Sequence, residues 1–207
     1  MLSHPNYISG NRTCADWQAK RTEIESSTDP KVWKSAFEDF FLERLELRCL
    51  RPIKVLQENG TFQGEGFSIA AIQCSLVEFL ESTVQGRSYR YLKRGETLGR
   101  FEYSWSSEIF VNFLVARNPF CREFSESVAR DFYEGVRCGL LHEAQTKQGW
   151  RIWARGPKII DANEKTLYRD NFQQALLEFV SDYGVRLQTD QESQSAFIRK
   201  FDGLCRP

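Results

Sequence analysis

The sequence of 207 residues is poor in histidine, and only His4 and His142 are present. It contains six cysteines, but they are widely spaced and form no C-x-x-C pair. A zinc site built from cysteine and histidine is therefore not expected. Without an export signal, the cysteines are expected to be reduced thiols. If a histidine performs acid–base chemistry near neutral pH, His142 is the candidate.

Long apolar runs, excess charge and a signal peptide are also missing. No run of about 18 apolar residues is present, so no membrane span is expected. The first residues, MLSHPNYISGNRT, lack the apolar core of a signal peptide, and a cytoplasmic location is expected. Lys+Arg and Asp+Glu are equal at 28 each. The overall charge therefore gives no support for nucleic-acid binding, which would require clustered basic residues.

Sequence motifs of several enzyme classes are absent. The chain has no G-x-x-x-x-G-K-[ST], no G-x-G-x-x-G and no G-x-S-x-G. Gly64 and Gly66 are interpreted as a loop pair rather than a phosphate cradle. No cluster of carboxylates stands out, although a metal-dependent nuclease would need one. No metal and no cofactor are therefore expected.

The residues that are abundant favour a globular, helical protein. The hydrophobic fraction is 41%, with five Trp and 16 Phe. Asp29 followed by Pro30 predicts a helix start, Pro52 predicts a break or kink, and Ser106 or Ser107 offers an N-cap. Apolar residues recur at helical spacing in six segments: 31–50, 67–84, 106–116, 120–144, 170–187 and 192–201. We predict an all-α bundle of about five to six helices.

Two parts of the chain differ from this helical pattern. Residues 1–29 are polar and are expected to form a loosely held segment, followed by one helical domain over 30–207. Between 149 and 168 the helical period is lost, and Trp150 and Ile152 alternate with Arg151. This pattern predicts a short β-hairpin or an extended flap, which follows the helix over 120–144 and could cover a groove beside it.

The helix predicted over 120–144 combines a buried stripe with the candidate histidine. Four apolar residues fall on one side: Val128, Phe132, Val136 and Leu140. Arg137 and His142 lie past the two edges of that stripe, about 140° apart around the helix axis. Gly135 and Gly139 each cost about 1 kcal/mol relative to alanine. We interpret them as leaving room for another backbone, for example a partner helix.

The stretch from Arg137 to His142, RCGLLH, resembles the R-x(4–6)-H motif of ribonucleases in the HEPN superfamily. The hydrophobic setting VRCGLLHEA and the surrounding helix order are similar as well. The resemblance covers about 25 residues closely and the rest of 30–207 loosely. Two positions depart from the family pattern. Cys138 stands where Asn, Asp or His is frequent, and Ala144 stands where one toxin branch has a tyrosine.

The resemblance implies a metal-independent endoribonuclease, a hydrolase acting on RNA. Arg137 would bind the scissile phosphate, because its planar fork suits phosphate oxygens. His142 would act as general acid or base. The resemblance also implies a homodimer that joins two motif copies in one cleft, and products with a cyclic phosphate and a 5′-hydroxyl. Such enzymes often serve as toxins or in antiviral defence, so an antitoxin or regulatory protein is a further partner to expect.

The same residues also allow structural, non-catalytic interpretations. His142 could be a helix-surface or part-buried histidine satisfied by a neighbour, and Arg137 could form a salt bridge with Glu134 or another acid. The chain would then be a non-catalytic helical module that binds a nucleotide or a protein partner and keeps the motif helix for dimer packing. Cys138 favours this alternative, since it replaces the family's usual polar residue; its expected role is that of a small residue at a packed interface.

A basic and aromatic segment, 87–105, is a second candidate for RNA contact. Its candidate binding residues are Arg87, Arg90, Lys93 and Arg94, which are interleaved with tyrosines. Basic and aromatic side chains together suit phosphate contact and base stacking. The alternative is a surface loop whose aromatic residues anchor it to the core. In the preceding helix, Glu78 and Glu81 are expected to be solvated, although either could reach an active-site groove.

Overall fold

The computed structural model describes residues 7–61 and 63–206. Residues 1–6 of the expected polar segment, which include His4, lie outside this part of the chain. The chain forms two compact units that interleave along the sequence. Unit 1 comprises residues 1–51, 82–104 and 182–207, and unit 2 comprises 52–81 and 105–181.

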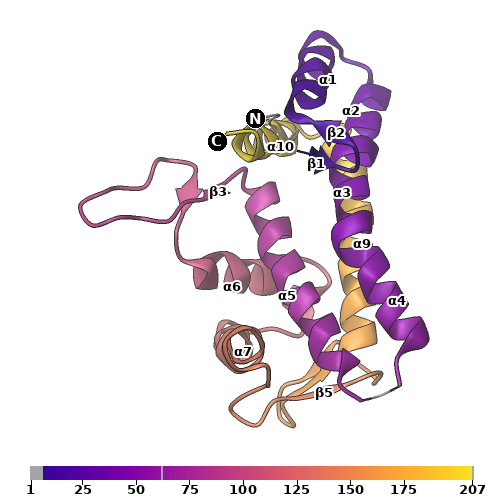
Figure 1. Cartoon of the computed structure of the whole chain (residues 1–207), viewed down its shortest axis with the longest axis vertical. Coiled ribbons are helices and arrows are strands. Elements are labelled where there is room, and N and C mark those ends of the chain that lie inside the picture. Colours follow the sequence, from indigo (N-terminus) through magenta and orange to yellow (C-terminus); the bar gives the residue numbers. More distant parts are fainter. Residues whose placement is uncertain (1–6, 62, 207) are drawn as a thin grey trace, which may run out of the picture. The chain divides into compact units, whose positions relative to one another are not determined.

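Unit 1 contains helices and two short strand pairs (Figure 1). Its elements are β1 (Tyr7–Ser9), β2 (Arg12–Thr13), α1 (Cys14–Ser26), α2 (Pro30–Ala36), the π-helical η1 (Phe37–Leu42), α3 (Glu43–Leu45), the π-helical η2 (Glu46–Leu50), β3 (Ser88–Tyr89), β4 (Glu102–Tyr103) and α10 (Gln191–Leu204). The end of α9 (Arg169–Leu187) also belongs to it. β1 pairs with β2 antiparallel, and β3 pairs with β4 parallel.

Unit 2 carries the motif helix and a three-stranded sheet. Its elements are α4 (Arg51–Asn59), most of α5 (Glu65–Val84), α6 (Ser106–Ala116), the 3₁₀ turn η3 (Phe120–Arg122), α7 (Glu126–Phe132), the π-helical η4 (Tyr133–Cys138), α8 (Gly139–Glu143), β5 (Arg151–Trp153), β6 (Ile160–Asp161), β7 (Thr166–Tyr168) and most of α9. Of the predicted all-α bundle, the mostly helical character is confirmed, whereas the small sheets in both units depart from it.

The N-terminal part of unit 1 is folded, contrary to the expected loose segment. Trp17 in α1 is completely buried, and its ring packs edge-on against Phe40 and Phe197. Its indole Nε1 donates a hydrogen bond to Asp202 at 2.9 Å. The error has a physical cause. Most residues of α1 are polar, and Trp17, which anchors the helix, contacts residues that are distant in the sequence, so no local pattern indicates its burial.

The predicted helix start at Pro30 is confirmed. At Pro52 the sequence predicted a break or a kink, and the break is wrong. The Asp29 side chain accepts a hydrogen bond from the Lys31 amide, with Pro30 in the first helical position. Helical structure then continues to Asn59. The π-helical η2 ends at Leu50, two residues before Pro52, and its turn is wider than an α turn. The wider turn relieves the clash between a proline ring and the carbonyl four residues earlier.

The region after the motif helix contains the predicted hairpin. β6 and β7 pair antiparallel, and β5 joins the other edge of β7 in parallel, giving the order β5-β7-β6. Trp150, directly before β5, is buried, and its ring packs edge-on against Phe132 of α7. The sheet is therefore fixed to the motif helix through an aromatic contact.

α5 is the most apolar long helix of the described residues. By length and composition alone it could cross a membrane, but 56% of that stretch is buried inside the protein. Such burial is typical of the core helix of a soluble protein. The predicted helix over 67–84 is confirmed and begins two residues earlier, at Glu65.

Candidate functional site

The motif lies on a helix that changes its winding along its length. Ser125 caps α7 by accepting a hydrogen bond from the Val128 amide, so the continuous helix begins at Glu126 rather than at Phe120. The π-helical η4 follows and includes Arg137, and α8 ends where Ala144 adopts a left-handed conformation with φ of 53°. The predicted spacing of about 140° between Arg137 and His142 assumed a regular α-helix, so it does not carry over.

The chain's own backbone, just after the motif helix, packs closely against the two glycines of that helix. The Gly135 carbonyl accepts a hydrogen bond from the Lys147 amide at 2.7 Å. A Cβ atom on Gly135 would collide with the Trp150 ring and lie 3.0 Å from the Lys147 carbonyl oxygen. A Cβ atom on Gly139 would collide with the Gln145 carbonyl oxygen. The close neighbour expected from the sequence is thus the segment after the helix, and no partner helix is needed to explain the glycines.

Gly135→Ala is expected to destabilise the protein by about 1–3 kcal/mol, because a methyl group has no space beside Trp150. Thermal or urea unfolding measures this effect. Gly66→Ala is the matched control, since its Cβ would make ordinary contacts of 3.4 Å or more in the first turn of α5. Equal stability of both variants and the wild type would contradict the close packing at Gly135.

Arg137 is held by polar groups from three elements of unit 2. Its Nη2 lies 3.3 Å from a carboxylate oxygen of Glu78 on α5 and 3.2 Å from the hydroxyl of Ser106 on α6. Its guanidinium also lies over the ring of Tyr133, 5.2 Å from the centroid. The Arg137 side chain is only 17% exposed. Burial acts to lower the pKa of Arg137, but Tyr133, Glu78 and Cys138 together outweigh it, so the pKa is raised and the side chain stays charged.

Neutral groups complete the surroundings of Arg137. The Tyr133 hydroxyl lies 3.0 Å from the Ser106 hydroxyl, and burial raises the pKa of Tyr133 above its ordinary value. Cys74 is buried on α5, and burial raises the pKa of its thiol to about 12, although the nearby Arg137 charge acts in the opposite direction. Among the described residues, Glu78 is the carboxylate that pairs with Arg137.

His142 lies in a different environment from Arg137. It is exposed in α8, the last turn of the motif helix, next to Leu141, which is 52% exposed. No hydrogen bond or ion pair joins the His142 ring to another residue in 7–61 or 63–206, and none joins it to Arg137. The His142 side chain is thus exposed and makes no hydrogen bond or ion pair within the described residues, while Arg137 is oriented by neighbours.

The four basic residues proposed for RNA contact divide into two kinds within unit 1. Arg87 donates to the Glu102 carbonyl at 2.8 Å and lies over the Tyr103 ring. Arg90 pairs with Glu102 at 3.1 Å, and this hydrogen bond raises the pKa of Arg90. Lys93 and Arg94 are exposed, and neither side chain makes a hydrogen bond or an ion pair with a described residue.

The aromatic residues of the same segment are also divided. Tyr103 is buried and anchors the segment, as the surface-loop interpretation expects. Tyr89 and Tyr91 are 55% and 73% exposed, and the Tyr89 ring also packs edge-on with Tyr103. The segment combines an anchored base with an exposed tip that carries Lys93 and Arg94.

Two partners of Arg137 were not identified from the sequence. Ser106 was expected to cap α6, but it makes no capping bond there and instead contacts Tyr133 and Arg137. Glu78 was expected in solvent, with a groove contact as the alternative, and it pairs with Arg137. Glu81 is only 1% exposed, so its predicted solvation is wrong. The sequence signal for both ion pairs was the presence of two acidic residues, three positions apart, in an otherwise apolar helix.

Comparison of the chain with models of protein families, with curated proteins and with solved structures gives no match. Among residues 7–61 and 63–206, no group of three or more His, Cys, Asp or Glu side chains could hold a metal ion. The assignment of a function therefore rests on the chemistry of the residues around Arg137 and His142.

Proposed function

We propose that the protein is a metal-independent endoribonuclease of the HEPN type, which acts on RNA as a homodimer in a toxin or antiviral-defence role. One observation carries the proposal. A single helical run presents an oriented, permanently charged arginine and, five residues later, an exposed histidine with no hydrogen-bond partner in the described residues. An arginine suits phosphate binding, and an unengaged histidine suits proton transfer near neutral pH.

In the proposed reaction, the RNA supplies its own nucleophile. The 2′-hydroxyl attacks the adjacent phosphorus while a base accepts its proton. An acid then protonates the departing 5′-oxygen, and Arg137 stabilises the negative charge on the phosphorane. His142 is the group proposed for proton transfer. Ser106 and Tyr133 act as positioning residues, because both contact Arg137.

A second copy of the chain supplies the second proton-transfer group in this proposal. One histidine does not easily serve as base and acid in the same step, and a two-fold dimer would bring two His142 residues to one cleft. Light scattering in solution tests this point against a chain mass of 24.1 kDa. A species of twice that mass that cleaves RNA supports the shared cleft, whereas an active strict monomer contradicts it.

Glu78 is proposed to compete with RNA for Arg137. Glu78→Gln keeps the shape of the side chain but removes its charge, and it is expected to tighten RNA binding by about two- to fivefold, the range of part-exposed ion pairs. Fluorescence anisotropy with a 2′-O-methyl RNA measures affinity without cleavage. Glu126→Gln is the control, because it removes the same charge from an exposed pair with Arg130. If both variants change affinity equally, Glu78 has no specific role.

A non-catalytic binding module is the second candidate, and the pairing of Arg137 with Glu78 favours it. A side chain that is 17% exposed and already faces a carboxylate resembles a structural salt bridge. Cys138 in place of the family's frequent polar residue points in the same direction. In this case the motif helix would serve packing or partner binding, and no RNA cleavage would be observed.

The chemical ends of the RNA products separate the proposed reaction from metal-dependent hydrolysis. RNA incubated with the protein in EDTA is expected to give fragments with a 2′,3′-cyclic phosphate and a 5′-hydroxyl, because the 2′-oxygen is the nucleophile. Fragments with 5′-phosphate ends that form only after Mg²⁺ is added would contradict the proposal. Intact RNA under both conditions would favour the binding module.

A further inference from the structure

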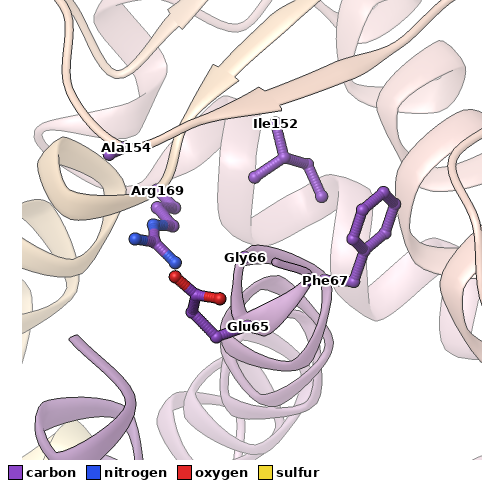
Figure 2. A pocket seen from close by; sticks show the side chains of 7 residues that line it. Glu65, Gly66, Phe67, Ile152, Ala154 and Arg169 are labelled. Carbon is purple, nitrogen blue, oxygen red and sulfur yellow. The ribbon is translucent and has the colours of Figure 1, made fainter. Parts of the chain in front are cut away.

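A pocket of unit 2 lies at the N-terminus of α5, and its lining includes neither Arg137 nor His142. It has a volume of about 140 Å³ and is lined by Gly64, Glu65, Gly66, Phe67, Ile152, Ala154 and Arg169. Figure 2 shows Arg169 and Glu65 pointing toward one another beside Gly66, with Ile152 and Phe67 on the other side. The sequence alone indicated only a loop pair of glycines at this place.

Arg169 is the unusual group in this pocket. Its side chain is 6% exposed, yet its Nε atom is buried without a hydrogen-bond partner. The nearest carboxylate oxygen in an ion pair with it belongs to Asp170, at 3.6 Å, which is longer than a hydrogen bond. Asp170 is also engaged by Gln57 at 2.8 Å. A buried arginine with an unpaired Nε donor is stabilised when an anionic ligand supplies a hydrogen-bond acceptor and a compensating charge.

The start of α5 supplies a second set of donors. The first amides of a helix have no partner within the helix, and the positive end of the helix dipole lies there. Phe67 donates to the Gly64 carbonyl at 3.0 Å, but the Gly66 amide makes no hydrogen bond to a described residue. Gly66 has no side chain to cover its amide, and a Cβ there would lie 3.6 Å from Nη1 of Arg169. The two donors therefore flank the same small space.

Glu65 decides which anion fits this space. One of its carboxylate oxygens accepts from the Gln63 amide at 3.0 Å, and a carboxylate has capacity for further hydrogen bonds. A fully deprotonated anion such as sulfate would be repelled by Glu65. A phosphate group retains a proton on part of its population near neutral pH, because its second pKa is about 6, and it can donate that proton to Glu65.

We propose that this pocket binds one phosphoryl group, with Arg169 and the Gly66 amide as donors and Glu65 as the acceptor of the phosphate proton. The volume of about 140 Å³ admits a tetrahedral oxyanion. It lies below the range of about 300–1,000 Å³ that encloses a drug-sized ligand, so only the phosphate end of a larger molecule would enter. This binding site does not depend on the proposed ribonuclease activity.

Calorimetric titration of the full chain with inorganic phosphate and with sulfate tests the proposal. The wild type is expected to bind phosphate and to bind sulfate at least tenfold more weakly. Gly66→Ala fills the space with ordinary contacts and is expected to lose phosphate binding while remaining folded. Arg169→Lys is expected to weaken phosphate binding by about 10- to 100-fold, the effect of losing charge-assisted hydrogen bonds. Glu65→Gln is expected to remove the discrimination against sulfate.

Arg151→Lys is the matched control for Arg169→Lys, because Arg151 pairs with Glu164 on the surface and does not line the pocket. It should bind phosphate as the wild type does. Titration with a nucleoside 5′-monophosphate identifies the source of the group: tighter binding than inorganic phosphate indicates a nucleotide end, and equal binding indicates the free ion. The proposal is overturned if the wild type gives no binding heat with phosphate, or if folded Gly66→Ala binds phosphate as tightly as the wild type.

Discussion

Glu81→Ala is expected to lower the free energy of unfolding by about 3–5 kcal/mol, the cost of removing one partner from a buried ion pair. Glu81 is 1% exposed on α5, and its two carboxylate oxygens accept from Nε and Nη2 of Arg117 at 2.8 and 2.9 Å. The hydrogen bonds to Glu81 raise the pKa of Arg117 despite its partial burial. Without Glu81, the Arg117 charge would remain half-buried and uncompensated.

Chemical denaturation compares this variant with two others. Glu126→Ala breaks an exposed pair with Arg130, in which both side chains are at least 60% exposed, and should cost less than about 1 kcal/mol. The double variant Glu81→Leu with Arg117→Met removes both charges and should recover much of the loss, because no unpaired charge remains buried. If Glu81→Ala is no more destabilising than Glu126→Ala, the pair does not stabilise the fold.

Local sequence signals predicted most of the helices correctly. The Asp29-Pro30 start is confirmed, and Ile109, Phe110, Phe113 and Leu114 are buried as their helical spacing predicted. The hairpin after the motif helix is present as β6 and β7. These features depend on neighbouring residues, so a single sequence contains the information for them.

The errors concern features that depend on contacts between distant residues. Trp17 and Asp202 are 185 residues apart, and Glu81 and Arg117 are 36 apart, so neither pair has a local signature. The same holds for Ser106 and Arg137, which are 31 apart. The π turns at η1, η2 and η4 were also not predicted, because the spacing of apolar residues was interpreted with a regular α-helical period.

His142→Ala has the largest expected effect on function. General acid–base catalysis contributes about 10²–10⁴-fold to a rate, so cleavage of RNA should fall by that factor. His142 is exposed and makes no hydrogen bond to a described residue. The free energy of unfolding of the variant should therefore lie within about 0.5 kcal/mol of the wild-type value. A loss of activity therefore cannot be attributed to a loss of folding, which distinguishes this position from Arg137.

Arg137 requires a different substitution, because its side chain is part of the packing around Ser106 and Tyr133. Arg137→Lys keeps the positive charge and removes the planar fork. If Arg137 binds the scissile phosphate, this variant should cleave more slowly even where its stability is unchanged. Gln145→Ala, at an exposed position three residues beyond His142, is the control for changes near the end of the motif helix.

The most direct measurement is the initial rate of RNA cleavage in EDTA, with the wild type, His142→Ala and Gln145→Ala purified in the same way. The proposed mechanism predicts cleavage by the wild type and by Gln145→Ala, and a rate at least 100-fold lower for His142→Ala. Equal rates for all three proteins would contradict the assignment of His142 as the proton-transfer group.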